Sequence, residues 1–215
     1  MGDYYPDRKW ATEGDSPSFL YVYANGLNVP EEITFGGWGG RFSDTPVENI
    51  RGMKFIAQSG KDESLYDPYR MYACAAEGGN SIKRWKREIW NNFAARMAWT
   101  ATDEYSAVNH HPVAIVDGHY GMNCIYKKVK AGRDMEFDAS ASYDPDGNPL
   151  AFRWEIYAEP STYKGKVNME NGDSPKCRIH IPAEASGKSL HVILSLTDRG
   201  KPALTAYKRI VVQVL

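Results

Sequence analysis

Two acidic residues near the N-terminus have the spacing to bind a metal ion. Glu13 and Asp15 stand beside the Ser16-Pro17 pair, and hard cations such as Ca²⁺ prefer clustered carboxylate oxygens. The pattern predicts Asp15 as a metal ligand and Glu13 as a ligand-binding residue. Alternatively, Asp15 or Ser16 caps a helix that has Pro17 at its first position. The spacing favours the cap, and the two roles are compatible because a capping residue can also reach outward.

A glycine-rich loop at residues 36–41 places Trp38 and Arg41 close together in the sequence Gly-Gly-Trp-Gly-Gly-Arg. The loop has neither the Gly-Lys-Ser/Thr ending of a P-loop nor the spacing of a dinucleotide fingerprint. A tryptophan among four glycines is costly to order unless something packs on it. Two interpretations stay open: Trp38 and Arg41 form part of a ligand-binding wall, or Trp38 fills the core.

The acidic turn beginning at Asp144 resembles a calcium loop only in part. Asp144, Asp146 and Asn148 copy the first three oxygen ligands of a helix-loop-helix calcium site, and Glu155 falls at its twelfth position. Pro149, however, occupies the position where that loop needs glycine, and Glu155 lies in an expected strand. We therefore interpret the segment as a structural turn.

The remaining titratable clusters predict structural roles. The basic cluster at 83–87 falls on the first turn of an expected helix, where cations oppose the helix dipole, so it should pair with acids or face water. His110 and His111 are adjacent and point in different directions, which predicts a hydrogen-bonded linker, not a shared metal ion. No Ser-His-Asp or Cys-His arrangement is identifiable, so no catalytic residue is predicted.

Composition limits the classes of partner. The 215 residues include 26 basic and 27 acidic side chains, a net charge of −1, which directs the protein neither to nucleic acid nor to an anionic membrane. No apolar run approaches the roughly 20 residues of a membrane span, and the first residues do not resemble a signal peptide. Cys74, Cys124 and Cys177 are expected to be buried free thiols. The aromatic fraction of 13% predicts an aromatic core or a surface that stacks on sugar rings.

The second half of the chain reads as an all-β domain. Short apolar stretches alternate with turn signals and share no helical period, which is typical of a two-sheet sandwich. The expected strands are Val113–Val116, Ile125–Val129, Met135–Asp138, Leu150–Tyr157, Cys177–Ile181, Leu190–Thr197 and Leu204–Leu215.

Residues 138–154 predict a hairpin around the turn 144–147. Proline suits the second position of a type I turn and glycine the fourth, while Asp144 can accept backbone N–H bonds. In the strand that follows, Phe152, Trp154 and Ile156 should share one face. Trp154 is therefore expected in the core of the sandwich.

The first half predicts helices and loops. Ser81 is a plausible N-cap for an amphipathic helix ending near Thr100. Residues 19–23 form a helix or a buried strand that ends at Asn25-Gly26-Leu27. Residues 43–68 form a long polar stretch, which is uncommon in a compact domain. We expect two domains, at residues 1–107 and 108–215.

Several separate motifs resemble one bacterial family. Residues 13–20, 25–27, 35–42, 92–99 and 109–112 look like the closing third of cellulose-binding proteins with a nucleoside-hydrolase-like domain. Residues 138–154 resemble the immunoglobulin-like sandwich, similar to polycystic-kidney-disease-type domains, that ends those proteins. The resemblance implies an α+β two-part chain. A truncated α/β nucleoside-hydrolase-like segment, mainly helices and loops, would precede an all-β immunoglobulin-like sandwich.

The resemblance also implies a function. Nucleoside hydrolases hold Ca²⁺ through an early aspartate cluster and one late aspartate, which Asp15 would match. The early cluster is not in this sequence, so hydrolysis by this chain alone is not expected. The resemblance implies a periplasmic or extracellular protein that binds a polysaccharide or glycan, and neither nucleic acid nor membrane. The alternatives are part of a calcium-dependent N-glycosidase, with calcium held in the full-length protein, or a spacer domain.

Overall fold

The computed structural model describes residues 16–46 and 72–215 of the chain. Glu13, Asp15 and most of the stretch 43–68 lie outside these ranges, so the predictions made for them stay predictions. Among the described helices, none has the length and apolar character needed to cross a membrane.

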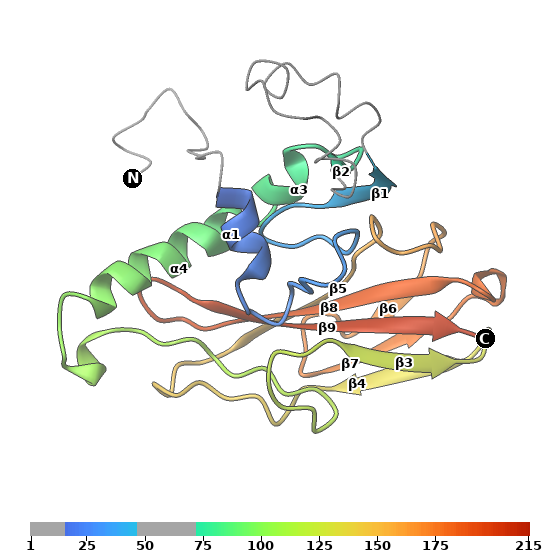
Figure 1. The fold of residues 1–215 in the computed structure, drawn as a ribbon. Helices are drawn as coiled ribbons and strands as arrows, with labels where there is room; N and C mark the ends of the chain where they lie inside the picture. The colour runs from blue at the N-terminus through green and yellow to red at the C-terminus, as the bar shows by residue number, and fades with distance from the viewer. Residues whose placement is uncertain (1–15, 47–71) are drawn as a thin grey trace, which may run out of the picture.

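The C-terminal part of the chain forms a β-sandwich (Figure 1). One sheet has the strand order β3-β9-β8-β5 and the other β4-β7-β6. All neighbouring strands in these sheets are antiparallel except β3 and β9, which are parallel. The strands are β3 Ile125–Val129, β4 Asp134–Asp138, β5 Ala151–Ile156, β6 Asn168–Glu170, β7 Lys176–His180, β8 Ser189–Thr197 and β9 Thr205–Val214. A short 3₁₀ helix, Ala183–Ala185, precedes β8.

One hydrophobic core fills the space between the two sheets. Because side chains alternate across a strand, every second residue of β8 and β9 points into this space. Trp154 on β5 is 4% exposed and stacks on Phe137, with ring centroids 5.6 Å apart, which confirms its predicted core position. The fully enclosed side chains include Ile179, Leu190, Val192, Leu194, Leu196, Ile210 and Val212. Burial of each such side chain stabilises the fold by about 1.5–3 kcal/mol.

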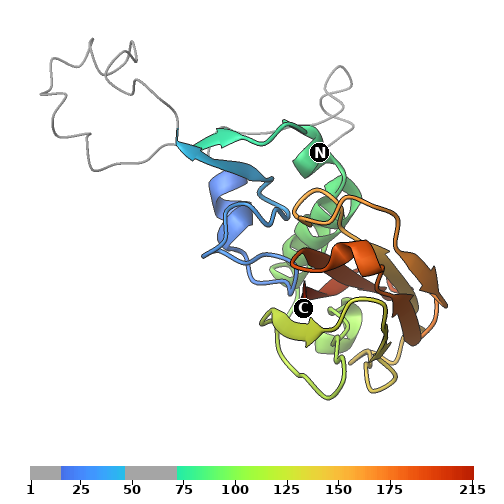
Figure 2. The ribbon, with the colours of Figure 1, turned by 90° about the vertical axis from the view of Figure 1, so that its right-hand side faces the viewer.

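The N-terminal elements lie against the sandwich (Figures 1 and 2). They are α1 Ser16–Val22, β1 Phe42–Pro46, β2 Tyr72–Cys74, α3 Asn80–Lys83, α4 Lys86–Trp99 and the 3₁₀ helix Tyr105–Ala107. Strands β1 and β2 pair with each other in an antiparallel ribbon. The described N-terminal part therefore packs on the β-domain, and its own sheet is limited to this two-stranded ribbon.

A second hydrophobic core joins the two parts. Ile193 of β8 and Tyr207 of β9 point away from the sandwich interior and pack on Leu27, Trp38 and Trp85 of the N-terminal part. Strands β8 and β9 are thus buried on both faces. Two polar residues on their outer face are covered too, since His191 is 1% exposed and Arg209 is 0% exposed.

Arg209 of β9 is the main polar link between the two parts. Its side chain is fully enclosed and donates to three backbone carbonyls: Nε to Leu27 at 2.7 Å, Nη1 to Phe35 at 3.2 Å and Nη2 to Gly36 at 2.7 Å. The guanidinium also lies 5.4 Å from the centre of the Tyr157 ring. Burial lowers the pKa of Arg209 to about 10, so the group stays charged at neutral pH.

His191 should make the stability of the protein depend on pH. Its Nδ1 lies 2.9 Å from Nη1 of Arg209, which can only donate, so the imidazole must accept and be neutral. Burial, and then the charge of Arg209, lower the pKa of His191 to about 3, below its ordinary value of 6.5. The stabilisation is complete above pH 6.5. It decreases as the pH falls from 6.5 towards 3, by up to about 1.4 kcal/mol per pH unit.

Urea unfolding at pH values from 7 to 4 measures this effect. We expect the stability of wild type to fall more steeply than that of His191→Gln, because glutamine can accept the Arg209 bond but cannot be protonated. Carboxylates contribute equally to both curves. Parallel curves for the two proteins would show that His191 does not carry the effect.

The turn predicted at Asn25-Gly26-Leu27 is confirmed after α1, and two steric constraints require glycine at position 26. Gly26 has φ = 83°, and a Cβ there would lie 2.0 Å from the carbonyl oxygen of Tyr207. Asn25 supports the turn by accepting the backbone N–H of Leu27 on its Oδ1 at 2.9 Å. The chain therefore reverses here with its backbone directly against β9.

The predicted hairpin across 138–154 was wrong, although the turn is correct. Gly147 N donates to Asp144 O at 3.1 Å, and Asp144 Oδ1 accepts the N–H of Asp146 at 3.0 Å. The flanking strands β4 and β5, however, belong to different sheets. The turn thus connects the two layers. The prediction failed because the alternation of apolar residues does not show which sheet a strand joins.

Two further strand predictions differ from the structure. Residues 113–116 make only isolated bridges, and the short strand β6 was not predicted.

The single helix predicted from Ser81 is two helices. Helix α3 ends at Lys83, and α4 begins at Lys86 and ends at Trp99, close to the predicted end. Ser81 is not an N-cap; it lies inside α3, where its Oγ donates to Gly78 O at 2.7 Å and accepts from Arg41 N at 3.2 Å. The thiols also differ from expectation, since Cys177 is buried but Cys74 is exposed.

Candidate functional site

A polar pocket of about 480 Å³ lies between α3, α4 and the outer face of β5 and β8. We call it the helix–sheet pocket. Strand β5 sends Phe152, Trp154 and Ile156 into the sandwich, so its alternate residues Arg153 and Glu155 line the pocket. Further walls are formed by Asn80, Ser81, Glu88, Glu159, Ser195 and Thr197.

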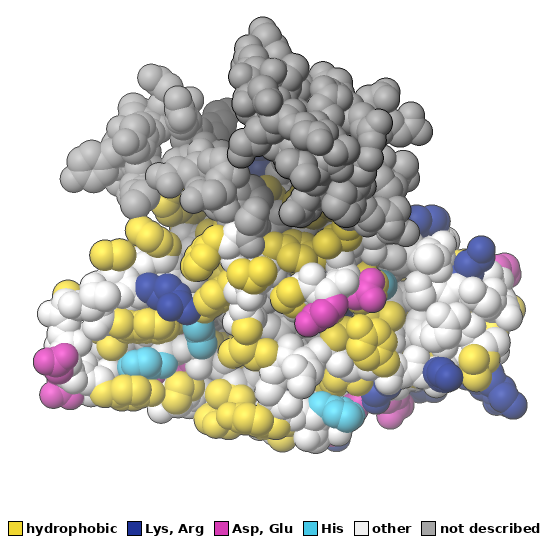
Figure 3. Space-filling view, in the orientation of Figure 1, with side chains coloured by type: hydrophobic (Ala, Val, Ile, Leu, Met, Phe, Trp, Pro, Cys, Tyr) yellow, Lys and Arg dark blue, Asp and Glu magenta, His cyan; other side chains and the backbone are white. Residues whose placement is uncertain are grey.

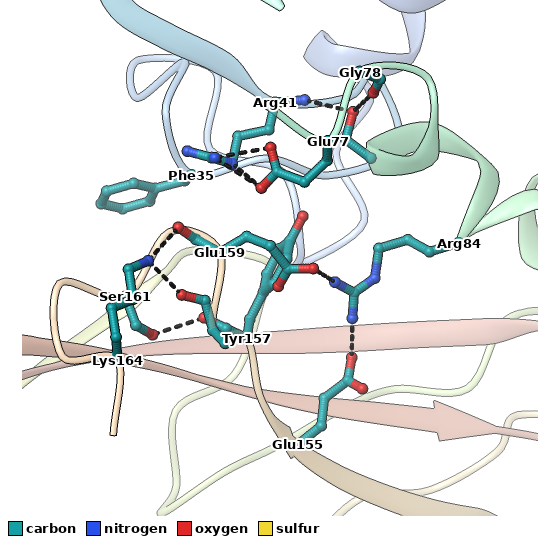
Figure 4. A network of polar contacts seen from close by, with 12 residues as sticks. Phe35, Arg41, Glu77, Gly78, Arg84, Glu155, Tyr157, Glu159, Ser161 and Lys164 are labelled. Carbon is teal, nitrogen blue, oxygen red and sulfur yellow. Dashed lines mark hydrogen bonds and ion pairs between the residues drawn. The ribbon is translucent and has the colours of Figure 1, made fainter. Parts of the chain in front are cut away.

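Arg84 organises the charges of this pocket (Figure 4). It reaches from the break between α3 and α4 to Glu159 at 3.0 Å and to Glu155 at 3.2 Å. Its guanidinium lies 4.7 Å from the ring centre of Trp85 and 4.3 Å from that of Tyr157. This confirms for Arg84 the expectation that the basic cluster pairs with acids. Because these groups are partly open to water, each ion pair stabilises the fold by less than about 1 kcal/mol.

Arg41 does not line this pocket itself, but it pairs with Glu77, which does. The two side chains form a bidentate pair, with Nη2 2.7 Å and 2.9 Å from the two carboxylate oxygens (Figure 4). Desolvation tends to raise the pKa of Glu77, but a backbone hydrogen bond and Arg41 outweigh it and lower that pKa overall. Arg41 is therefore committed to a neighbouring carboxylate, and its predicted role in ligand binding stays a prediction.

Two buried polar atoms on residues that line this pocket have no hydrogen-bond partner within the described ranges. They are Nε1 of Trp85, a donor, and Oε2 of Glu88, an acceptor. Both atoms are enclosed in this conformation, so their burial does not by itself make them ligand contacts. The aromatic rings offer no stacking face either, because Trp85 is 4% exposed and Tyr157 is 1% exposed.

A second pocket, of about 500 Å³, lies where the linker between the two parts meets the sandwich. We call it the linker pocket. Asn109 lines it and is held in place by its Nδ2, which donates to Asp198 Oδ2 and to Pro202 O, both at 2.9 Å. Asn148 donates to Asn109 Oδ1 at 3.0 Å. The rest of the wall includes Tyr105, Ser106, Pro145, Asp146, Gly200 and Lys201.

Trp38 lies in the second core, which is one of the two interpretations that the sequence left open. It is 1% exposed, stacks on Tyr23 with ring centroids 5.4 Å apart, and donates from Nε1 to the hydroxyl of Tyr207 at 3.2 Å. Asn28 accepts the backbone N–H of Trp38 at 3.0 Å. In this conformation Trp38 has no open face on which a sugar ring could stack.

The predicted metal ligand cannot be placed, because Asp15 and Glu13 lie outside the described residues. Within 16–46 and 72–215, no three His, Cys, Asp or Glu side chains are grouped so as to hold a metal ion. The described residues therefore provide no ligand set for calcium, and we derive no chemical step through a metal.

Sequence analysis missed most of the residues that line the helix–sheet pocket. Arg84 and Glu155 are 71 positions apart in the chain, and only the docking of α3 on β5 brings them together. One signal was present: Arg153 and Glu155 occupy the outward positions of a strand whose inward face is apolar. Two charges on the outer face of a strand do not by themselves distinguish a pocket from a solvated surface.

The described residues form a β-sandwich domain with a segment of helices and a two-stranded ribbon packed on its larger sheet. Two family models match the chain. One, described as the nucleoside hydrolase-like domain of cellulose-binding Sde182, matches residues 1–42, and the other, the C-terminal domain of cellulose-binding protein Sde0182, matches residues 134–214. The chain belongs to this family.

A solved structure supports the assignment over the whole chain. It is a nucleoside hydrolase-related hypothetical protein from Saccharophagus degradans, described as associated with carbohydrate metabolism. Its sequence is 42% identical, the match covers 100% of this chain and 50% of that one, and the TM-score is 0.83. The chain thus spans about half the length of this relative.

Weaker similarity extends to other β-domains. The PKD domain of the KIAA 1837 protein matches 47% of this chain and 85% of its own, with 16% identity and a TM-score of 0.33. Repeats 21–23 of human CDH23 match 49% of this chain and 33% of their own, with 14% identity and a TM-score of 0.35. TM-scores at this level do not establish a shared fold. No functionally curated protein matches the sequence.

Proposed function

We propose that this chain binds cellulose or a related glucan and does not act as a catalyst by itself. The observation that carries the proposal is membership of a family described as cellulose-binding, through matches at both ends of the chain. The 42% identical relative, described as associated with carbohydrate metabolism, supports the same ligand class.

The geometry is compatible with a glycan ligand. Both pockets are polar, and their volumes of about 480 and 500 Å³ fall in the range of small-ligand sites. They are lined by carboxylates, amides and hydroxyls, which are the groups that hydrogen-bond sugar hydroxyls. Hydrophobic side chains are also spread over the face shown in Figure 3, and the exposed aromatic residues of the described chain include Tyr105, Tyr120, Tyr126 and Tyr143.

Depletion from solution by insoluble cellulose tests the proposal. The purified chain is mixed with increasing amounts of microcrystalline cellulose, and the protein left in the supernatant is measured. We expect saturable depletion by cellulose and weaker depletion by starch granules, which present α-linked glucose. Equal amounts of soluble protein with and without cellulose would refute the proposal.

A second candidate function is suggested by the match at residues 1–42, which contains Asp15. In this alternative, a longer protein containing the segment is a calcium-dependent N-glycosidase or glycan hydrolase, and Asp15 is one of its metal ligands. Calorimetric titration of the longer protein with Ca²⁺, together with nucleoside and oligosaccharide cleavage assays, distinguishes the two. If the longer protein neither binds Ca²⁺ nor cleaves any of these substrates, this alternative is eliminated.

The proposed ligand also suggests a location. Cellulose is an insoluble polymer outside cells, so a protein that binds it would act in the periplasm or outside the cell. Fractionation of the producing bacterium would test this, and recovery of the protein only in the cytoplasmic fraction would contradict it.

A further inference from the structure

Tyr105 in the linker pocket is an exposed aromatic ring that the structure holds in a fixed orientation. It stacks on His110 with ring centroids 3.7 Å apart and an angle of 6° between the ring planes. His110 in turn stacks on Trp99 at 5.8 Å and 10°. Tyr105 is nevertheless 57% exposed, so its face opposite His110 is open among the described residues.

Hydrogen bonds fix the middle and inner rings of this stack. Asp146 accepts the backbone N–H of His110 at 2.6 Å and lies 2.9 Å from His110 Nδ1, which must carry the proton to donate to a carboxylate. Trp99 Nε1 donates to Asn109 O at 2.8 Å. A ring that is already oriented loses little conformational entropy when a ligand packs on it.

The other exposed tyrosines lack this support. Tyr120 is 69%, Tyr126 is 63% and Tyr143 is 48% exposed, and in the described part of the chain none of them stacks on another ring. None of the three lines the helix–sheet pocket or the linker pocket. Tyr105 therefore differs from them in having both a fixed ring plane and an adjoining cavity.

The cavity beside Tyr105 supplies hydrogen-bonding groups of both kinds. The carboxylate of Asp146 retains lone pairs beyond those used by His110, and the side-chain oxygen of Asn148 is an acceptor as well. Lys201 makes no ion pair with a described residue and is a free donor. A β-linked glucose ring has C–H bonds on its faces and hydroxyls around its edge, which matches one aromatic face bordered by acceptors and a donor.

We propose that the linker pocket is a glucan-binding subsite in which one glucose ring stacks on the open face of Tyr105. The edge hydroxyls of that ring donate to Asp146 and Asn148 and accept from Lys201. This proposal rests on the proposed glucan-binding function and specifies which residues carry it. The linker pocket is a better candidate for sugar stacking than the helix–sheet pocket, because the aromatic rings of the helix–sheet pocket are buried.

Cellulose depletion and affinity electrophoresis with a soluble β-glucan, applied to single variants, test the subsite. We expect Tyr105→Ala to weaken binding about tenfold or more, as loss of an aromatic anchor does. Tyr105→Phe should retain binding because the ring face remains. Tyr120→Ala removes a tyrosine that is even more exposed but lies outside the pocket, and this variant should bind like wild type. Urea unfolding of each variant verifies that the fold is intact.

The outcomes separate this proposal from the broader one. If wild type and Tyr105→Ala bind equally, the subsite is refuted and glucan binding stands. If Tyr105→Ala and Tyr120→Ala are weakened equally, binding does not depend on the linker pocket and the subsite is again refuted. If wild type binds neither cellulose nor the soluble glucan, both proposals fail together.

Discussion

Replacing Arg209 by methionine is expected to destabilise the protein by about 3 kcal/mol or more. The substitution removes the donor from the buried carbonyls of Leu27 and Gly36 and from the partly buried carbonyl of Phe35, and each buried group left unsatisfied costs about 1–3 kcal/mol. Removing the buried charge relieves its desolvation cost, which offsets part of this loss. Because three acceptors are stranded by one substitution, the loss should dominate.

The free energy of unfolding in urea measures this effect, and Arg178→Met is the matched control. Arg178 on β7 has a side chain that is 48% exposed and pairs with Asp134 at the surface. Its replacement should change stability by less than about 1 kcal/mol. Similar losses in the two variants would show that Arg209 does not join the two parts of the chain.

Replacing Trp38 by alanine is expected to cost about 3–5 kcal/mol of stability, the usual effect of truncating a buried tryptophan. The variant loses the stack on Tyr23 and the hydrogen bond to Tyr207, and it leaves a cavity in the second core. Urea unfolding followed by tryptophan fluorescence and circular dichroism measures the loss. Trp38→Phe should cost less, because it keeps most of the apolar volume and lacks only the indole donor.

This prediction affects how binding data are interpreted. A Trp38→Ala variant that loses cellulose binding and is also strongly destabilised gives no information about a ligand contact. The opposite result would contradict the core assignment. If Trp38→Ala keeps its stability and loses binding, the side chain contacts the ligand and the first of the two sequence interpretations is correct.

The strands of the sandwich could be predicted because a half-buried strand has a local signature. The predicted stretch Ile125–Val129 coincides with β3, and the predicted stretch Leu190–Thr197 differs from β8 by one residue. Trp154 was placed correctly in the core because its neighbours on the same face, Phe152 and Ile156, are apolar. Pairing is less local: β3 lies beside β9 in parallel, which no short-range pattern indicates.

The break between α3 and α4 shows why the helix prediction failed at its start. The apolar period is continuous through Trp85, so sequence reasoning favours one helix. In the structure Trp85 is 4% exposed, with ring centroids 5.6 Å from Tyr207 and 6.0 Å from Tyr157. The helix break coincides with the position where the chain packs on the outer face of the sandwich, a contact with residues far away in sequence.

The sequence by itself determined most of the sandwich strands, the turn at Asp144, the turn at Gly26 and the family resemblance, because each depends on residues close together in the chain. Only the tertiary structure decided that Trp38 is enclosed, that Arg209 holds the N-terminal loop, and that Tyr105 is the tyrosine with a fixed, open ring. These properties depend on which surfaces face each other after folding. An aromatic residue reads the same in a sequence whether packing covers it or leaves one face free.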